Sequence, residues 1–440
     1  MADKKTDKAH TKWSYNTNIY EVNVRQYTPE GTFQAFGKNL PRLREMGVET
    51  LWFMPITPIS ETNRLGSLGS YYAIKDYKGI NPEFGTMEDF KSLVNEAHNL
   101  GFKVIVDFVA DHTGNDHPWL IEHPDFFVRD QNHDFLHPHG WSDVTQLNYD
   151  VPELWKYMID VLKFWVNECD LDGFRCDMAH LVRLDFWIEA KKKLSKVKED
   201  LFWLGECEAP VYHQVFDATY TWRWMHASQE FYQNKMNLQS LLTVLYKSVT
   251  EFPCTAMRVY FTSNHDENSW NGTEYEKYGD AAQLLAVFSC TWDGIPMIYS
   301  GQELPNRKRL KFFDKDQIDW DGNFQLQQFY KTLLTLKSNN KSLRGGDPKV
   351  ATQIVSHPDD HRVFAYLRKH KKGQVLTILN FCGEGLDFDV INVDGVYRNI
   401  FGGNDINFKA TSHVYLNAWG YLVFERIDIE SIQSTNLPAR

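Results

Sequence analysis

The chain has 440 residues, with 42% apolar and 24% charged side chains and a formal net charge of −11. This length exceeds one ordinary domain and predicts one large α/β domain with a smaller companion. The negative charge argues against a nucleic acid partner, because phosphate binding requires a basic face, and no run of 18 or more apolar residues is present to span a membrane.

Both ends of the chain are predicted to be tails. Residues 1–17 open with the polar, Lys-rich stretch MADKKTDKAHTK, and residues 429–440 follow the last predicted strand. The first tail either follows a removed targeting segment, which would make the protein periplasmic or secreted, or belongs to a complete cytoplasmic chain. The sequence leaves the compartment and the oligomeric state open.

Short apolar runs alternate with longer helical patterns through most of the chain, which is typical of a parallel sheet covered by helices. Thr86 is expected to cap a helix that ends at Gly101, with Asp89 completing an approximate capping box. A second helix is expected to begin near Asp150 and Pro152. Eight strands are predicted, at residues 18–24, 48–55, 103–109, 173–177, 202–206, 214–217, 258–264 and 295–301.

Eight right-handed β-α units close naturally into a (β/α)8 barrel, predicted here at residues 18–112 and 152–344. Residues 113–151 interrupt it after the third strand, and a loop this long in a compact domain is usually functional. Residues 345–428 alternate in the manner of an all-β unit and predict a C-terminal sandwich. Its strands are predicted at residues 353–356, 363–368, 374–381, 386–390, 413–416 and 421–425.

Polar side chains follow four of the predicted barrel strands, at the end where such barrels carry their active sites. They are Asp107, Asp111, His112, Arg175, Asp177, Glu206, Asn264, His265 and Asp266. Carboxylates that converge on one barrel mouth repel each other, but glycoside hydrolysis needs them as nucleophile and acid. The alternative is a set of structural salt bridges, which would require the same coincidence on four strands.

The carboxylates can be given separate roles from their surroundings. Arg175 lies two residues before Asp177 on one strand, so both side chains point the same way and Arg175 can hold Asp177 ionised. Glu206 follows the apolar run FWLG, where burial would raise its pKa and keep it protonated. Asp266 could bind sugar hydroxyls together with the two histidines and stabilise a cationic transition state.

Seven segments also carry a family resemblance: SYYAIKDY (70–77), NPEFGTMEDF (81–90), DFVADH (107–112), GFRCDMAH (173–180), LGE (204–206), SNHD (263–266) and GIPMIYSGQE (294–303). Along essentially its whole length the chain resembles the α-amylase family, glycoside hydrolase family thirteen, and within it the bacterial α-amylases. The resemblance implies that Asp177 is the nucleophile, Glu206 the acid/base and Asp266 the transition-state stabiliser. It implies an inserted domain at 113–151 and a C-terminal β domain.

The resemblance also implies further substrate-binding residues, namely Tyr72 as an aromatic platform, Asp107, His112, Arg175, His180 and His265. Trp270, just after Asp266, either extends the sugar-binding cleft with Asn268 or only covers the barrel rim. Asp111 stands where the family usually has an Asn that ligates calcium, and Asp is also a suitable hard oxygen donor. Leu181 replaces a His whose carbonyl often completes that site, so calcium stays possible but not established.

Other polar clusters are given structural interpretations. His133, His137 and His139 lie close in sequence but lack the carboxylate or Cys spacing of a metal site. The six cysteines show no metal or disulfide pattern and are predicted to be free, buried thiols. Two of them, Cys176 and Cys207, adjoin predicted catalytic positions, but strand alternation turns them away.

The activity that the resemblance implies is endo-acting, retaining α-1,4-glucan hydrolysis of starch or maltooligosaccharides. Neopullulanase, α-glucosidase and transglycosylase activities use the same residues and remain alternatives. A non-catalytic glucan-binding relative would lack one or more of the three carboxylates, and all three are present. Chain-length and branch preference depend on loop shapes that the sequence does not give.

Overall fold

The fold was obtained as a computed structural model, which describes residues 10–320, 322–357, 360–371, 373–409 and 411–427. Eight parallel strands form a closed barrel in the order β1-β10-β9-β8-β7-β6-β3-β2. The strands are β1 (Ile19–Val22), β2 (Thr50–Phe53), β3 (Lys103–Val109), β6 (Gly173–Asp177), β7 (Phe202–Gly205), β8 (Ala218–Tyr220), β9 (Met257–Tyr260) and β10 (Ile295–Tyr299). The predicted (β/α)8 barrel is confirmed.

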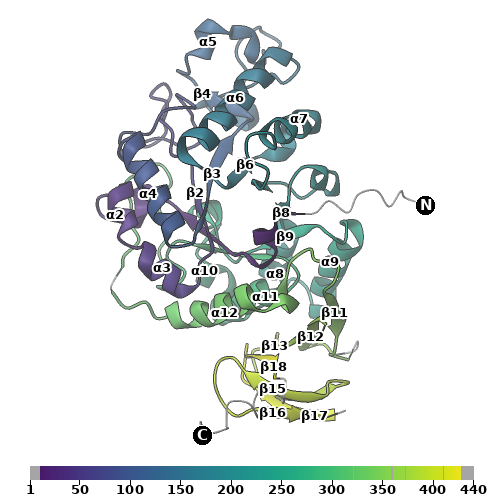
Figure 1. The fold of residues 1–440 in the computed structure, drawn as a ribbon. Helices are drawn as coiled ribbons and strands as arrows, with labels where there is room; N and C mark the ends of the chain where they lie inside the picture. Colours follow the sequence, from purple (N-terminus) through teal and green to yellow (C-terminus); the bar gives the residue numbers. More distant parts are fainter. Residues whose placement is uncertain (1–9, 321, 358–359, 372, 410, 428–440) are drawn as a thin grey trace, which may run out of the picture.

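Helices surround the barrel (Figure 1). They are α1 (Val24–Tyr27), α2 (Phe33–Gly37), α3 (Leu40–Met46), α4 (Met87–Asn99), α6 (Pro152–Cys169), α7 (Leu184–Leu194), α8 (Trp222–Tyr232), α9 (Leu238–Glu251), α10 (Glu274–Tyr278), α11 (Ala282–Thr291) and α12 (Gln327–Asn339). Local sequence explains where the clearest of them begin. Thr86 and Asp89 form a reciprocal capping box at the start of α4, and Pro152 occupies the first turn of α6.

Two apolar layers hold the barrel together. Strand residues of alternate parity fill its interior, including Trp52, Phe202 and Met257, which are fully buried. The opposite side chains pack against the helices in one continuous core. A barrel filled in this way has no pore, so chemistry is confined to the loops at its rim.

The segment after β3 rises above the carboxyl ends of the barrel strands, where α5 (Trp119–Glu122) lies at the top of Figure 1. Its base is an antiparallel pair, β4 (His112–Gly114) with β5 (Val144–Gln146), in which His112 is paired with Gln146. This pair fixes both ends of the excursion beside the barrel mouth.

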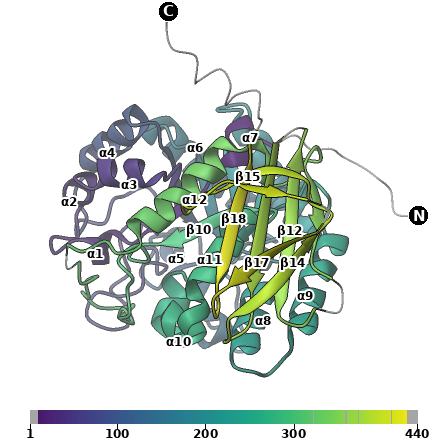
Figure 2. The ribbon, with the colours of Figure 1, turned by 90° about the horizontal axis from the view of Figure 1, so that it is seen from below.

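The C-terminal β unit lies at the opposite end of the barrel (Figures 1 and 2). A six-stranded sheet, in the order β11-β12-β13-β18-β15-β16, packs on a two-stranded sheet, β14-β17, through a separate apolar core. The strands are β11 (Ala351–Ile354), β12 (Val363–His370), β13 (Gly373–Asn380), β14 (Leu386–Ile391), β15 (Gly395–Asn399), β16 (Ile406–Phe408), β17 (Thr411–Leu416) and β18 (Tyr421–Arg426).

The predicted strand positions require correction. The sixth barrel strand is not at 214–217 but begins at Ala218, and 3-10 helix η5 (Pro210–Gln214) precedes it. Val215 and Phe216 are buried in the connection, and a short apolar run does not distinguish a strand from such a connection. β15 and β16, with their Gly and Asn residues, were not predicted.

The predicted N-terminal tail is wrong for residues 10–17. His10 is buried, with Nδ1 3.2 Å from Asp217 Oδ1 and Nε2 2.6 Å from the carbonyl oxygen of Thr255, and η1 (Lys12–Asn16) follows it. These contacts fasten the segment to the underside of the barrel. Residues 1–9 and the tail predicted at 429–440 lie outside the described residues.

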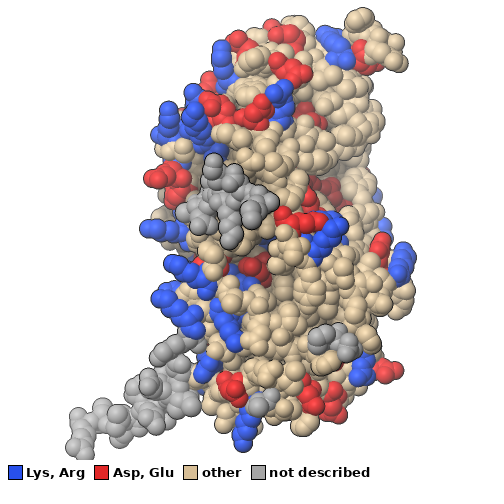
Figure 3. Space-filling view, turned by 90° about the vertical axis from the view of Figure 1, so that its right-hand side faces the viewer, with Lys and Arg blue, Asp and Glu red and all other residues tan. Residues whose placement is uncertain are grey.

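Charged side chains of both signs lie on the surface of the protein. On the face in Figure 3, Lys and Arg alternate with Asp and Glu around a broad uncharged region. None of the helices described here combines the length and hydropathy that a bilayer crossing requires. Of the cysteines, Cys254 is exposed and Cys382 half-buried, so the prediction that all six are buried is wrong.

Candidate active site

A cavity of about 370 Å³ opens at the carboxyl ends of the barrel strands. It brings together side chains that are far apart in the sequence, because parallel strands end at one rim. The lining residues are Leu65, Ser70, Tyr72, His112, Trp141, Asp143, Val144, Asp177, Met178, Glu206, His265, Asp266, Trp270, Phe312 and Phe313. Four carboxylates, those of Asp143, Asp177, Glu206 and Asp266, therefore face one cavity.

Arg175 connects two of these carboxylates from below. Its side chain is fully buried, and Nη1 donates to Asp177 Oδ1 at 2.6 Å. Nη2 lies 2.9 Å from Glu206 Oε2, although that contact lacks hydrogen-bond geometry. One guanidinium thus contacts both carboxyl groups and stabilises negative charge between them.

The environment of Glu206 favours the protonated form of its carboxyl group. Burial is the main cause that raises its pKa, and the negative charges of Asp177 and Asp266 add to it. Arg175 and the backbone N–H of Met178 act in the opposite direction, and the resulting pKa is about 7. That N–H donates to Glu206 Oε2 at 2.9 Å. Because the residue follows β7 directly, the strand fixes its direction and the Met178 peptide fixes its carboxyl group.

Asp266 is held by a charged histidine. His265 Nε2 lies 3.1 Å from Asp266 Oδ2, and His265 Nδ1 lies 2.5 Å from Glu21 Oε1. Burial lowers the pKa of His265, but the two carboxylates raise it more, so it stays well above its ordinary value. The imidazolium in turn lowers the pKa of Asp266 against the effect of burial. The side chain of Asp266 remains 38% exposed, which leaves it accessible from the cavity.

Tyr72 forms part of the cavity floor. Its ring stacks on His265 with centroids 5.4 Å apart and on Phe312 at 6.2 Å. Its hydroxyl lies 2.9 Å from His265 Nε2 and donates to Asp107 Oδ2 at 3.1 Å. The exposed part of this ring offers a flat apolar surface of the kind on which a sugar face can rest.

The predicted site residues therefore separate by position. Those that reach the cavity are Tyr72, His112, Asp177, Glu206, His265, Asp266 and Trp270. The side chains of Asp107 and Arg175 are fully buried and do not line the cavity, so the structure places them where they can orient other side chains. His180 is exposed beside the cavity without lining it, and its Nδ1 lies 3.4 Å from the Glu206 carbonyl oxygen.

Several residues at the site escaped the sequence analysis. Glu21 does not line the cavity but contacts His265, and its signal was a carboxylate inside the apolar strand IYEV. Phe312 and Phe313 belong to the loop after β10, where two adjacent aromatics among charged residues were the available signal. Trp141 and Asp143 come from the excursion, and no pattern placed them.

Of the two residues predicted either to extend the cleft or to cover the barrel rim, Trp270 reaches the cavity and Asn268 does not. Trp270 lines the cavity, with its ring 5.4 Å from that of Phe312. Asn268 is buried, accepts from the backbone N–H of Leu310 at 2.9 Å and donates to the carbonyl of Lys308 at 3.1 Å. The Asn therefore fastens the loop after β10, while the Trp faces the cavity.

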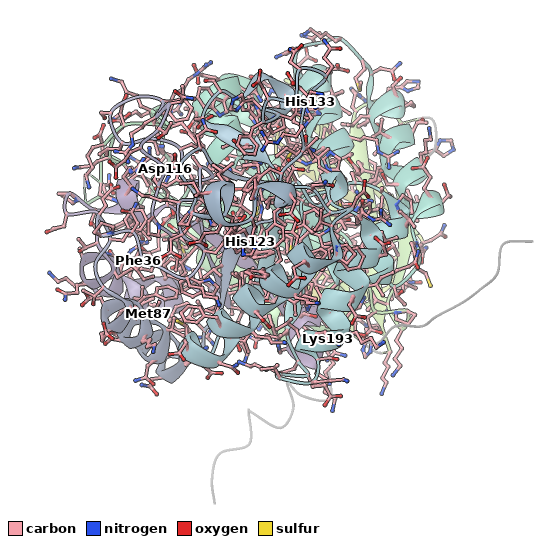
Figure 4. The ribbon with its side chains drawn as sticks, turned by 90° about the horizontal axis from the view of Figure 1, so that it is seen from above. Phe36, Met87, Asp116, His123, His133 and Lys193 are labelled. Carbon is pink, nitrogen blue, oxygen red and sulfur yellow. The ribbon has the colours of Figure 1, made fainter. Side chains whose placement is uncertain are left out.

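The donor set around Asp111 does not fit a carboxylate-rich calcium site. Its side chain is buried, and its Oδ2 lies 3.4 Å from His112 Nδ1. Among the residues that the structure describes, no three His, Cys, Asp or Glu side chains are grouped to hold a metal. His133 is likewise not part of such a group among the described residues. It lies at the edge of the top face, away from His123 and Asp116 (Figure 4).

Comparisons with known proteins agree with this arrangement. The sequence profile described as "Alpha amylase, catalytic domain" matches residues 4–143 and 127–345. The chain belongs to the α-amylase family. The crystal structure of an α-amylase from Lactobacillus plantarum is 30% identical, with a TM-score of 0.84 over 94% of this chain and 100% of that one. The noncanonic maltogenic α-amylase AmyB from Thermotoga neapolitana is 29% identical, with a TM-score of 0.86 over 94% and 99%.

The family assignment makes this chain a glycoside hydrolase, and retention is general for the family. α-Amylase MalA from Haloarcula japonica is 27% identical over 430 residues, which cover 91% of this chain but only 61% of MalA. Other relatives are named cyclomaltodextrinase, maltogenic α-amylase and neopullulanase. These names denote enzymes of different substrate specificity. Membership of the family therefore identifies the type of reaction but not the particular substrate.

Proposed function

We propose that this α-amylase family member hydrolyses α-1,4-glucosidic bonds of starch or maltooligosaccharides, with retention of configuration at the anomeric carbon. The observation that carries the proposal is the single guanidinium of Arg175 in contact with Asp177 and Glu206 at the cavity floor. Because both carboxyl groups contact the same guanidinium, they lie close enough to act on one glycosidic bond, as a retaining mechanism needs.

In the first step the Asp177 carboxylate attacks the anomeric carbon, and a covalent bond forms as the bond to the leaving oxygen breaks. Glu206 donates its proton to that oxygen, so the leaving sugar departs with a free hydroxyl. With its pKa raised to about 7, Glu206 retains this proton as pH rises toward 7. Arg175 stabilises the ionised form of Asp177 before the attack.

In the second step a water molecule attacks the same carbon from the side that the leaving group vacated. Glu206, now a carboxylate, accepts a proton from this water, and the bond to Asp177 breaks. The acid/base proton and the free Asp177 carboxylate are thereby restored. Two inversions at one carbon give net retention.

Asp266 and His265 act on the sugar and not on the leaving group. Their ion pair at 3.1 Å presents one carboxylate and one charged N–H donor to the cavity. The carboxylate can accept hydrogen bonds from sugar hydroxyls and stabilise positive charge that develops at the ring. His112, buried beside the nucleophile strand, adds a further polar group at the cavity wall.

A direct test follows the anomeric protons of the first products of maltoheptaose by NMR. The α anomer should appear first and mutarotate later, whereas a β anomer would contradict retention. Asp177→Asn should abolish turnover. Glu274→Gln provides a matched carboxyl-to-amide control, because Glu274 is buried and accepts from Thr262 and Gln302 without lining the cavity. Full activity in Asp177→Asn would remove the nucleophile assignment.

A further inference from the structure

Two loops meet beside the cavity and form part of its wall. The backbone N–H and the hydroxyl of Ser67, in the loop after β2, donate to Asp314 Oδ1 at 2.9 and 2.6 Å. The N–H of Leu68 donates to the carbonyl of Phe313 at 2.9 Å, in the loop after β10. We call residues 65–68 with 313–314 the loop bridge.

The bridge leaves no gap between its halves. A Cβ atom added at Gly66 would lie 2.5 Å from Phe313 Cβ, and Gly66 has a φ of +62° that few other residues adopt. Leu65 and Phe313 belong to the bridge and also line the cavity. The contact therefore forms part of the cavity wall, and a polysaccharide chain cannot pass through it.

The bridge is also supported from below. Arg25, in α1, donates through Nη1 to the carbonyl of Gly69 at 3.1 Å and is paired with Glu83 at 2.9 Å. Gln26, its neighbour, donates to the carbonyl of Lys311 at 2.7 Å. Both loops are thus attached to the same short helix, and these buried, paired side chains favour a fixed wall over a mobile lid.

The order of the barrel strands shows which end of the cavity is closed. In the closed order, β7 lies across the barrel from β1, and β2 and β10 are the two neighbours of β1. Glu206 follows β7, whereas the bridge joins the loops after β2 and β10. An acid must lie beside the leaving oxygen, so the leaving sugar occupies the Glu206 side. The bridge lies at the opposite end, toward the non-reducing part of the chain.

We propose that the loop bridge makes this site act on non-reducing chain ends, releasing products of about two glucose units, because a cavity of this size encloses only a small ligand. The inference rests on the proposed function and replaces the internal cleavage expected from the sequence. Tyr72 supports the first of these sugars, and Phe312 with Trp270 provides the surface for the next. Beyond that surface the bridge ends the site.

A matched pair of substrates tests this directly. One is p-nitrophenyl maltoheptaoside, and the other carries a 4,6-O-ethylidene block on its non-reducing sugar. The wild-type enzyme should cleave the free heptaoside at least tenfold faster than the blocked one, and reducing-end-labelled maltoheptaose should shorten by a constant small step. Equal rates on the two heptaosides would overturn the proposal. Cleavage of neither heptaoside would instead mean that the proposed hydrolase function has failed.

Variants of the bridge assign the effect to it. The double variant Ser67→Ala/Asp314→Ala should bring the cleavage rates of the two heptaosides closer together. Phe313→Ala, which also removes part of the cavity wall, should have the same effect. Asp319→Ala is the control, because Asp319 lies in the same loop but its side chain is 76% exposed and paired with Lys308 at 3.6 Å. Retained cleavage of the free heptaoside identifies folded variants. An unchanged ratio in both bridge variants would overturn the role of the bridge.

Discussion

Glu21 Oε1 lies 2.5 Å from His265 Nδ1, which places a buried carboxylate of the first barrel strand behind a histidine at the cavity. The other nitrogen of the ring faces Asp266 and the hydroxyl of Tyr72. A neutral imidazole could donate from only one nitrogen, whereas the imidazolium donates from both. The position of Glu21 therefore determines that His265 presents a charged donor to the site.

Glu21→Gln should lower the pKa of His265, because one of the two carboxylates that raise it is lost. Since the pKa of His265 is raised in the folded protein, the stabilising charge is present at low pH and is lost as pH rises through that pKa. The variant should lose it at lower pH than the wild type, with activity reduced about 10- to 100-fold, the scale of one charge-assisted hydrogen bond. NMR titration of the His265 ring, with Glu274→Gln as control, measures the shift; an unchanged titration would refute the role.

The pH profile should report Glu206. Its pKa of about 7 is that of the acid, so kcat/KM on maltooligosaccharides should fall as pH rises above about 7. A glycosyl fluoride does not need the acid, since fluoride leaves unprotonated. With α-maltosyl fluoride this alkaline limb should weaken or disappear. A limb that is identical for both substrates would assign the titration to another group.

Arg175→Met should destabilise the fold as well as the chemistry. The residue is fully buried and paired with Asp107 at 3.0 Å and Asp177 at 2.6 Å, so its loss leaves buried carboxylates without a counter-charge. Removal of one partner from a buried ion pair typically destabilises by about 3–5 kcal/mol. Thermal unfolding should show this loss, and addition of Asp107→Asn should recover part of it. No recovery in the double variant would argue against direct coupling.

The barrel and its carboxylates could be predicted because both depend on local patterns. The run KVIVDFV is a strand buried on both faces, and β3 was placed without error. Asp177, Glu206 and Asp266 follow strands, so the topology alone brings them to one rim. The sixth strand was misplaced because Val215 and Phe216 are equally apolar in a buried connection.

The closed end of the cavity could not be predicted, because it depends on contacts between loops. Nothing in the sequence around Ser67 indicates that its partner is Asp314, more than 200 residues away in the chain. For Glu21, the sequence could have indicated that a partner exists, because a buried carboxylate inside an apolar strand requires one. The identity of that partner, His265, depends on how the strands are arranged around the barrel, and residue spacing along the chain does not give it.

Chelation should leave the enzyme unchanged, because the side chains near Asp111 do not form a carboxylate-rich cation site. We expect the unfolding temperature with excess EDTA to match that without it. A drop of several degrees that added calcium reverses would show that backbone or amide oxygens complete a site at Asp111. Asp111→Asn would then test whether the Asp111 side chain is one of the calcium ligands.

Trapping of the covalent intermediate tests the central claim most directly. In Glu206→Gln, α-maltosyl fluoride can still glycosylate the nucleophile, because its leaving group needs no acid, while the second step lacks its base. Mass spectrometry of the intact protein should show the addition of one maltosyl group, and peptide mapping should place it on Asp177. An adduct on another residue, or turnover by inversion with no adduct, would contradict the assignment of Asp177 as nucleophile.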